Sequence, residues 1–169
     1  MPVGGEAHVS IGGVPVRVSA SFWWMTLMLS LQPRYDTGHG FSQAIVWASL
    51  IFPTVLFSEL AHAIVAKWFG GRPAITLYAL GGVTNGIPIG ITRGRMALIA
   101  IAGPIASFLI AFGLLATLKI PGLHKPGATL LTQALAINVA WGLLNLMPVL
   151  PFDGGHLLAA ALGPRRILE

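Results

Sequence analysis

The chain has 169 residues, of which 55% are apolar and only 9% are charged, and its mean hydropathy is +0.80. Soluble domains carry about 25% charged residues, so this composition excludes an ordinary water-soluble protein and predicts one membrane-embedded domain over residues 1–169. The net charge of +5 fits basic loops beside membrane spans better than nucleic-acid binding. Because the chain has no cysteine, a metal would need His, Asp or Glu ligands, which suit zinc or another divalent ion.

The N-terminal part of the chain predicts two short strands followed by an apolar segment. The strands are expected within residues 7–18, around a Gly12–Gly13 turn. The apolar run over 22–33 is too short to cross a hydrocarbon core of about 30 Å, which needs about 20 residues. This first span therefore begins before residue 22, extends through Pro33, or crosses only part of the membrane.

A second span is predicted from residue 41 to about residue 69. The segment 73–85 is rich in Gly, Thr and Ile, and it predicts a pair of strands or a hairpin with Gly81–Gly82 as the step between them. The third span is predicted over 94–118, where small side chains allow close helix packing.

The C-terminal part predicts a fourth span over 128–147 and then a broken helix. Pro148 and Pro151 interrupt the helix before Asp153, and a short apolar helix is expected over 154–162. Non-helical backbone at membrane depth must be buried in protein or line a wet cavity. We therefore expect an α-helical membrane protein with about four transmembrane helices, a small β element and a Pro-broken re-entrant segment.

Basic residues are distributed unevenly between the two sides that four spans would create. One side carries seven of them: Arg17, Lys67, Arg72, Arg93, Arg95, Arg165 and Arg166. The other side carries three: Arg34, Lys119 and Lys125. The positive-inside rule then places both termini and the strand-forming 73–85 segment in the cytoplasm.

Two of the five acidic residues, Glu59 and Asp153, lie in apolar sequence. A carboxylate in hydrocarbon costs several kcal/mol unless it is paired, metal-bound or hydrated. Each has a histidine three residues later, one helical turn away: His62 after Glu59 and His156 after Asp153. These pairs suggest a buried metal site.

The segment Ser58–His62 has the outline of H-E-x-x-H with its first histidine replaced. In the intact motif both histidines bind zinc and the glutamate is the general base. The alternative is a helical Glu–His hydrogen bond that only satisfies two buried groups. The segment Asn145–Gly155 likewise has a structural alternative, a Pro-broken helix with Asp153 as its N-cap, and both interpretations can hold together.

Four motifs in this order resemble the site-2 protease family of intramembrane zinc metalloproteases. They are Ser58–His62, Leu80–Val83, Ala102–Pro104 and Asn145–Gly154. The resemblance covers the chain from about residue 14 to residue 158. It implies a zinc endopeptidase of a bacterial or archaeal cell membrane that cleaves a partner protein in or near its transmembrane segment.

The resemblance also implies a role for each matching residue. His62 and Asp153 match two of three zinc ligands, and Glu59 matches the catalytic glutamate. Gly81 and Gly82 match a strand region thought to pair with unwound substrate backbone. Asn145 matches a polar residue near the active site that helps to hold substrate.

Ser58 departs from the family pattern, because it stands where the first zinc-binding histidine is expected. A neutral hydroxyl is a weak zinc ligand, and catalytic zinc usually has three protein ligands. Zinc binding and activity are therefore expected to be weak or absent. Three explanations stay open. Ser58 could be a deliberate substitution that silences the protease, or the chain could be a natural pseudoprotease that acts as a membrane scaffold or accessory subunit. Alternatively, another residue could complete the site, and His156 is the nearby candidate.

Two further interpretations stay open at this point. Ser58 could act as a nucleophile with Glu59 and His62, although no oxyanion-binding loop is evident. The chain could also be a transporter, since buried carboxylates mark proton paths. A transporter predicts pH-dependent flux without a metal, and the sequence has no inverted repeat to support it.

Overall fold

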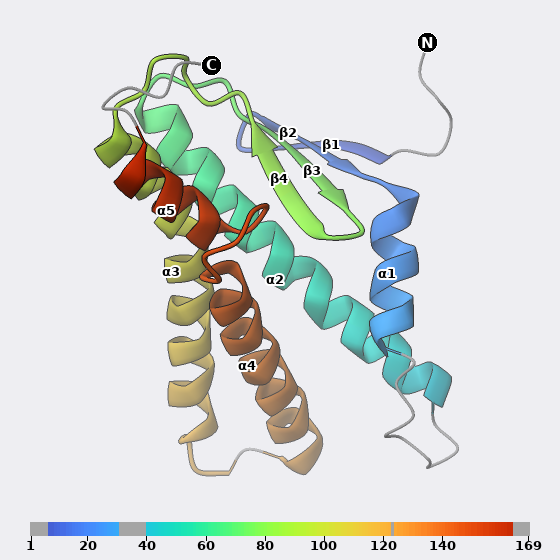
Figure 1. Cartoon of the computed structure of the whole chain (residues 1–169). Coiled ribbons are helices and arrows are strands. Elements are labelled where there is room, and N and C mark those ends of the chain that lie inside the picture. Colours follow the sequence, from blue (N-terminus) through green and yellow to red (C-terminus); the bar gives the residue numbers. More distant parts are fainter. Residues whose placement is uncertain (1–6, 31–39, 123, 164–169) are drawn as a thin grey trace.

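Three long apolar helices form the body of the molecule (Figure 1). This computed structural model describes residues 7–30, 40–122 and 124–163. The helices are α2 (Gly40–Trp68), α3 (Arg93–Leu118) and α4 (Lys125–Asn145). Each of the three contains a stretch long and apolar enough to cross a membrane. The expected class, an α-helical integral membrane protein, is confirmed.

The first expected span corresponds to α1 (Ala20–Ser30), which has 11 residues. Such a helix is shorter than the roughly 20 residues that a complete crossing needs. The rest of that expected span falls in residues 31–39, which lie outside the described part of the chain. Within the described residues, three helices rather than four meet the length and composition of a membrane span.

Both expected strand pairs are present, and they join into one four-stranded sheet in the order β1-β2-β3-β4. The strands are β1 (Ala7–Ile11), β2 (Val14–Val18), β3 (Ala74–Tyr78) and β4 (Gly81–Asn85). Each hairpin is antiparallel, whereas β2 and β3 pair in parallel, with Val16 opposite Ile75. Gly81 and Gly82 were expected between two strands, but they are the first residues of β4.

The sheet lies at one end of the helical bundle, against α1 and α2 (Figure 1). Alternate residues of a strand point to opposite faces, and the alternating side chains of β2 and β3 are buried on the helix side. The resulting core contains Val14, Val16, Ile75 and Leu77 from the strands, with Phe22, Val55, Leu56 and Ala63 from the helices. This packing holds the β3–β4 hairpin beside the middle of α2.

The Pro-rich segment between α4 and α5 (Asp153–Leu162) forms tight turns, as expected. A methyl group at Gly155 would lie 2.6 Å from the backbone of Val149 and Leu150, and one at Gly154 would meet Met147 in the same way. The two glycines therefore let the start of α5 pack directly on the turn. Phe152 is the N-cap and Asp153 is the first helical residue, so Asp153 is not the cap itself.

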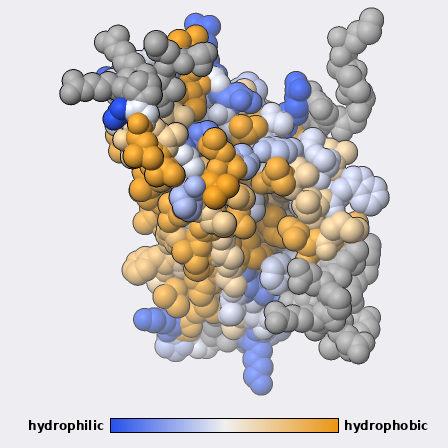
Figure 2. Space-filling view, viewed as in Figure 1, coloured by the Kyte–Doolittle hydropathy of each residue, from blue (hydrophilic) through white to orange (hydrophobic). Residues whose placement is uncertain are grey.

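The molecular surface has an apolar band between two more hydrophilic ends (Figure 2). Many large apolar side chains of α3 and α4 are exposed, for example Leu109, Phe112 and Leu143. A soluble protein seldom exposes apolar surface on this scale, whereas a lipid-facing surface requires it.

Candidate metal centre

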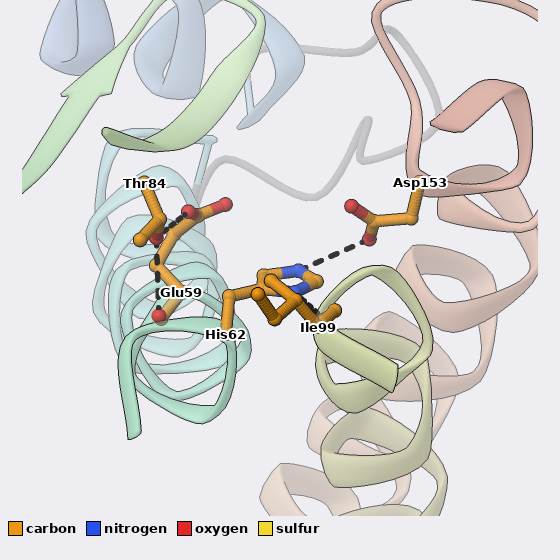
Figure 3. A network of polar contacts seen from close by, with 5 residues as sticks. All are labelled: Glu59, His62, Thr84, Ile99 and Asp153. Atoms are coloured by element: carbon orange, nitrogen blue, oxygen red, sulfur yellow. Dashed lines mark hydrogen bonds and ion pairs between the residues drawn. The ribbon is translucent and has the colours of Figure 1, made fainter. Parts of the chain in front are cut away.

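Asp153 and His62 come from opposite parts of the sequence and meet inside the bundle. The Nε2 atom of His62 lies 3.2 Å from Oδ2 of Asp153. The two side chains are 6% and 17% exposed, and they point toward one another from α2 and α5 (Figure 3). A carboxylate this deep needs a hydrogen-bond donor or a positive charge beside it, and Nε2 of His62 is the atom at that position.

The other ring nitrogen of His62 fixes the orientation of the imidazole. Nδ1 lies 2.7 Å from the carbonyl oxygen of Ile99 on α3. A carbonyl can only accept, so Nδ1 carries the hydrogen and donates it. In the neutral ring Nε2 then presents a lone pair to Asp153. Two electron-rich groups at this separation require a positive charge between them, which a proton or a metal ion supplies.

The geometry of the pair suits a zinc ion. Two ligands at about 2.0–2.1 Å from a tetrahedral centre lie about 3.3 Å apart. The separation of 3.2 Å between His62 and Asp153 is close to this value. A second hydrogen bond that orients a metal-binding histidine is also a general feature of such sites, and the Ile99 carbonyl provides it. These two residues therefore fit zinc.

Ser58, which occupies the position expected for the third ligand, does not fit zinc. Ser58 is 1% exposed, and its Oγ is buried without a hydrogen-bond partner among the described residues. A methyl group at Gly103 on α3 would lie 2.7 Å from this Oγ and would also overlap the ring of His62. Gly103 thus lets both side chains pack closely against α3. The hydroxyl is a poor zinc donor, so the donor set is one strong ligand short.

His156 does not complete the set. It lines the same cavity as His62 and Asp153, one helical turn after Asp153. Yet within the described ranges no three His, Asp or Glu side chains converge closely enough to hold a metal ion. The structure therefore gives no support to His156 as the compensating ligand.

The serine-nucleophile interpretation also lacks the required geometry. In a Ser-His-Asp triad the serine and the carboxylate bond to different ring nitrogens. Here the Nδ1 atom of His62 binds the Ile99 carbonyl, its Nε2 atom faces Asp153, and Ser58 bonds to neither.

Glu59 lies beside this pair but is held by the sheet. The hydroxyl of Thr84 on β4 donates a hydrogen bond of 2.7 Å to Oε2 of Glu59 (Figure 3). A methyl group at Gly82 would lie 2.6 Å from the carboxyl carbon of Glu59. Only a residue without a side chain leaves room for Glu59 at this point, so Gly82 helps to define the position of the Glu59 carboxyl group.

A cavity of about 260 Å³ joins the two parts of the site. Its walls come from α2, β4, α3 and the start of α5, and they include Glu59, His62, Gly82, Thr84, Asp153 and His156. One water molecule needs roughly 10–15 Å³, so the cavity has room for several waters. The cavity brings a carboxylate, an imidazole and a strand together.

Two expected substrate-binding residues lie elsewhere. Asn145 is the last residue of α4 and is partly exposed, and it is not among the residues that line the cavity. Gly81 is next to Gly82 but faces Trp141, whose ring a methyl group at Gly81 would approach to 2.7 Å. Their expected contact with substrate stays a prediction.

Two contributors to the site escaped the sequence analysis. Thr84 follows Gly82 by two residues in a strand, so strand alternation places both on the same face. That pattern could have identified Thr84 once Gly82 was assigned to the strand. The Ile99 carbonyl gives no signal in the sequence, because any residue at that position carries the same group.

Comparison with known proteins gives a consistent result. The solved structure of the site-2 protease from Methanocaldococcus jannaschii matches with a TM-score of 0.71 and 30% identity, covering 94% of this chain and 72% of that one. A zinc metalloprotease from the same organism is 32% identical over 162 residues, which are 92% of this chain and 44% of the relative. No family model matches the chain.

A candidate zinc metalloprotease from Synechocystis is 31% identical over 159 residues, which are 88% of this chain and 42% of the relative. The chain thus spans less than half the length of these two curated relatives.

Proposed function

The chain belongs to the site-2 protease family, and from this premise we propose that it is the core of an intramembrane zinc endopeptidase impaired by Ser58. Its substrate would be a partner protein cleaved in or near a transmembrane segment. The observation that carries the proposal is the 3.2 Å approach of His62 to Asp153 beside Glu59, in one cavity within the membrane-spanning part. The bacterial and archaeal relatives support a prokaryotic cell membrane as its location.

The residues divide the chemistry between them. His62 and Asp153 would hold zinc, which when bound supplies a Lewis acid and lowers the pKa of a bound water. Glu59 accepts a proton from the attacking water and returns it to the departing amine. Ile99 keeps the lone pair of the His62 Nε2 atom aimed at Asp153.

The peptide would bind along β4. This strand is at the end of the sheet order, with β3 as its neighbour, and residues 82–85 line the cavity. An edge strand offers backbone donors and acceptors to an extended peptide, which can add to the sheet as a further strand. The Gly81–Gly82 pair leaves little side chain in the way.

The second candidate function is a non-catalytic membrane scaffold, and Ser58 is the reason to consider it. Its unpartnered hydroxyl is the observation that favours this alternative, because it leaves the metal position without its third strong ligand. Ser58→His separates the candidates, with Ser58→Ala as the matched control, since alanine removes the hydroxyl without adding a ligand.

For a silenced protease, Ser58→His should raise zinc affinity by more than roughly 100-fold, because a direct ligand should exceed the 10–100-fold effect of an outer-shell partner. Purified variants would be assayed for zinc by elemental analysis and for cleavage of a transmembrane substrate. If Ser58→His binds zinc at one ion per chain and cleaves while Ser58→Ala does neither, the protease assignment holds. Unchanged zinc content and no cleavage would favour the scaffold.

We also propose that the sheet end faces the cytoplasm. That end carries Lys67, Arg72 and Arg95, whereas Lys119 and Lys125 lie at the opposite end of α3 and α4. Because the chain has no cysteine, single Arg72→Cys and Lys119→Cys variants can be labelled in intact cells. An impermeant thiol reagent should modify the Lys119→Cys protein alone. Labelling of Arg72→Cys alone would reverse the orientation.

A further inference from the structure

We propose that Thr84 is a positioning residue that orients the carboxylate of Glu59 and so links the peptide-binding strand to the general base. The inference rests on the proposed function, which makes Glu59 the base and β4 the peptide-binding strand. No feature of the H-E-x-x-H outline points to a residue so far along the chain.

The first observation is the hydrogen bond itself. Oγ1 of Thr84 lies 2.7 Å from Oε2 of Glu59 and 3.2 Å from the backbone carbonyl oxygen of the same residue. A hydroxyl has one proton to donate, and a bond to a carboxylate is shorter and stronger than one to a neutral carbonyl. The carboxylate oxygen at 2.7 Å is therefore the acceptor, and the backbone carbonyl oxygen at 3.2 Å is a secondary contact of the same hydroxyl.

The second observation is the shape of the strand around Glu59. A methyl group at Gly82 would lie 2.7 Å from Oε1 and 2.6 Å from the carboxyl carbon. Gly82 and Thr84 lie on the same face of β4 because one residue separates them. The strand thus contacts the carboxyl group at two successive positions of that face, one by close approach and one by a hydrogen bond.

These contacts distinguish the two carboxylate oxygens. Thr84 occupies Oε2, whereas Oε1 points toward the side of the site on which Asp153 lies (Figure 3). The free oxygen is therefore the one available to take a proton from water in the cavity. Without the hydroxyl, the carboxyl group could rotate about its last side-chain bond, and the free oxygen would no longer be defined.

The link to the strand follows from the location of Thr84. A peptide that pairs with β4 would fix the backbone of the same residue whose side chain holds Glu59. Substrate binding would then restrict the general base through a single residue. A purely structural Thr84, one that only helps β4 to pack, predicts no such effect on Glu59.

The first test observes Glu59 without any need for activity. The chain contains three glutamates, Glu6, Glu59 and Glu169. Replacing Glu6 and Glu169 with alanine leaves Glu59 as the only glutamate, so carboxyl-¹³C glutamate gives one carboxylate NMR signal. Thr84→Val should shift this signal and broaden it, while Thr84→Ser, which keeps the hydroxyl, should leave it near its original position. Thr76→Val on β3 is the matched control, since the Thr76 hydroxyl makes no hydrogen bond among the described residues.

The second test measures cleavage in the Ser58→His background. Loss of one hydrogen bond to a charged group predicts that Thr84→Val lowers kcat by about tenfold or more, with KM within about twofold and zinc content unchanged. Thr84→Ser should restore kcat to within about threefold.

The outcomes separate this inference from the proposed function. An unchanged Glu59 signal in Thr84→Val overturns the positioning role, whatever the cleavage assay gives. A shifted signal with unchanged kcat also overturns it. If the Ser58→His protein cleaves nothing, the proposed function fails, and the NMR comparison still decides whether Thr84 orients Glu59.

Discussion

The two halves of the site differ in how completely their polar groups are satisfied. In the base half, formed by Glu59, Gly82 and Thr84, the carboxylate has a hydroxyl donor and a close-fitting strand. In the proposed metal half, formed by Ser58, His62 and Asp153, two groups are paired, and the Ser58 hydroxyl has no partner within the described part of the chain. If the proposed function holds, Ser58 leaves the metal half one strong ligand short, whereas the carboxylate of the base half has its hydrogen-bond donor.

This difference shows what holds each half in place. The His62 ring is oriented by a backbone carbonyl and packs beside Gly103, and Asp153 is carried by a turn packed on Gly154 and Gly155. Ser58 shares the close packing at Gly103, but it takes no part in the hydrogen bond to Ile99 or in the turn that carries Asp153. Packing and a backbone hydrogen bond are therefore what position His62 and Asp153.

The largest expected effect on cleavage comes from a substitution in the base half alone. In the Ser58→His background, Glu59→Gln should lower the cleavage rate by roughly 10²–10⁴-fold, which is the usual contribution of a general acid–base. Zinc binding should stay the same, because Glu59 bonds to Thr84 and not to His62 or Asp153. Steady-state cleavage and zinc titration measure the two effects. A parallel loss of zinc would show that the two halves are not separable.

A substitution that displaces a ligand of the metal half has a smaller expected effect, and this effect is on zinc affinity. In the same background, Gly103→Ala places a methyl group against the ring of His62. Displacing an oriented ligand should weaken zinc binding by roughly 10–100-fold, which zinc titration would measure.

Gly113→Ala is the matched control on the same helix, since a methyl group there meets nothing within 4 Å. Equal zinc affinities in the two alanine variants would mean that Gly103 does not position His62.

The smallest expected effect comes from a polar contact away from both halves. Asn138 on α4 donates a hydrogen bond of 3.1 Å to Thr54 on α2, and both residues are buried. Hydrogen bonds between membrane helices average about 0.6 kcal/mol, so Thr54→Val should reduce the free energy of unfolding by about 1 kcal/mol or less. Reversible unfolding in mixed micelles would measure this, and zinc binding should be unchanged. A larger loss would make this contact a main determinant of the bundle.

Local sequence patterns determined the long helices, the first hairpin and the two acidic residues of the candidate site. Long apolar runs are sufficient to identify α2, α3 and α4, because a segment in lipid must satisfy its backbone within its own helix. Gly12–Gly13 and the strand-forming residues around it were sufficient for the first hairpin. Two carboxylates in apolar sequence directed attention to Glu59 and Asp153, because an unpaired charge is costly there.

The family resemblance predicted that His62 and Asp153 share a site, but only the tertiary structure shows which groups are in contact. The approach of His62 to Asp153, the parallel pairing of β2 with β3, and the hydrogen bond from Thr84 to Glu59 join segments that no local pattern relates. The same packing leaves Asn145 out of the cavity lining, and among the described residues it does not bring His156 together with His62 and Asp153 as a three-residue metal site. Hydrophobic periodicity and turn residues act over a few neighbouring positions. The contacts named above arise from how whole helices and strands pack, which depends on the entire chain.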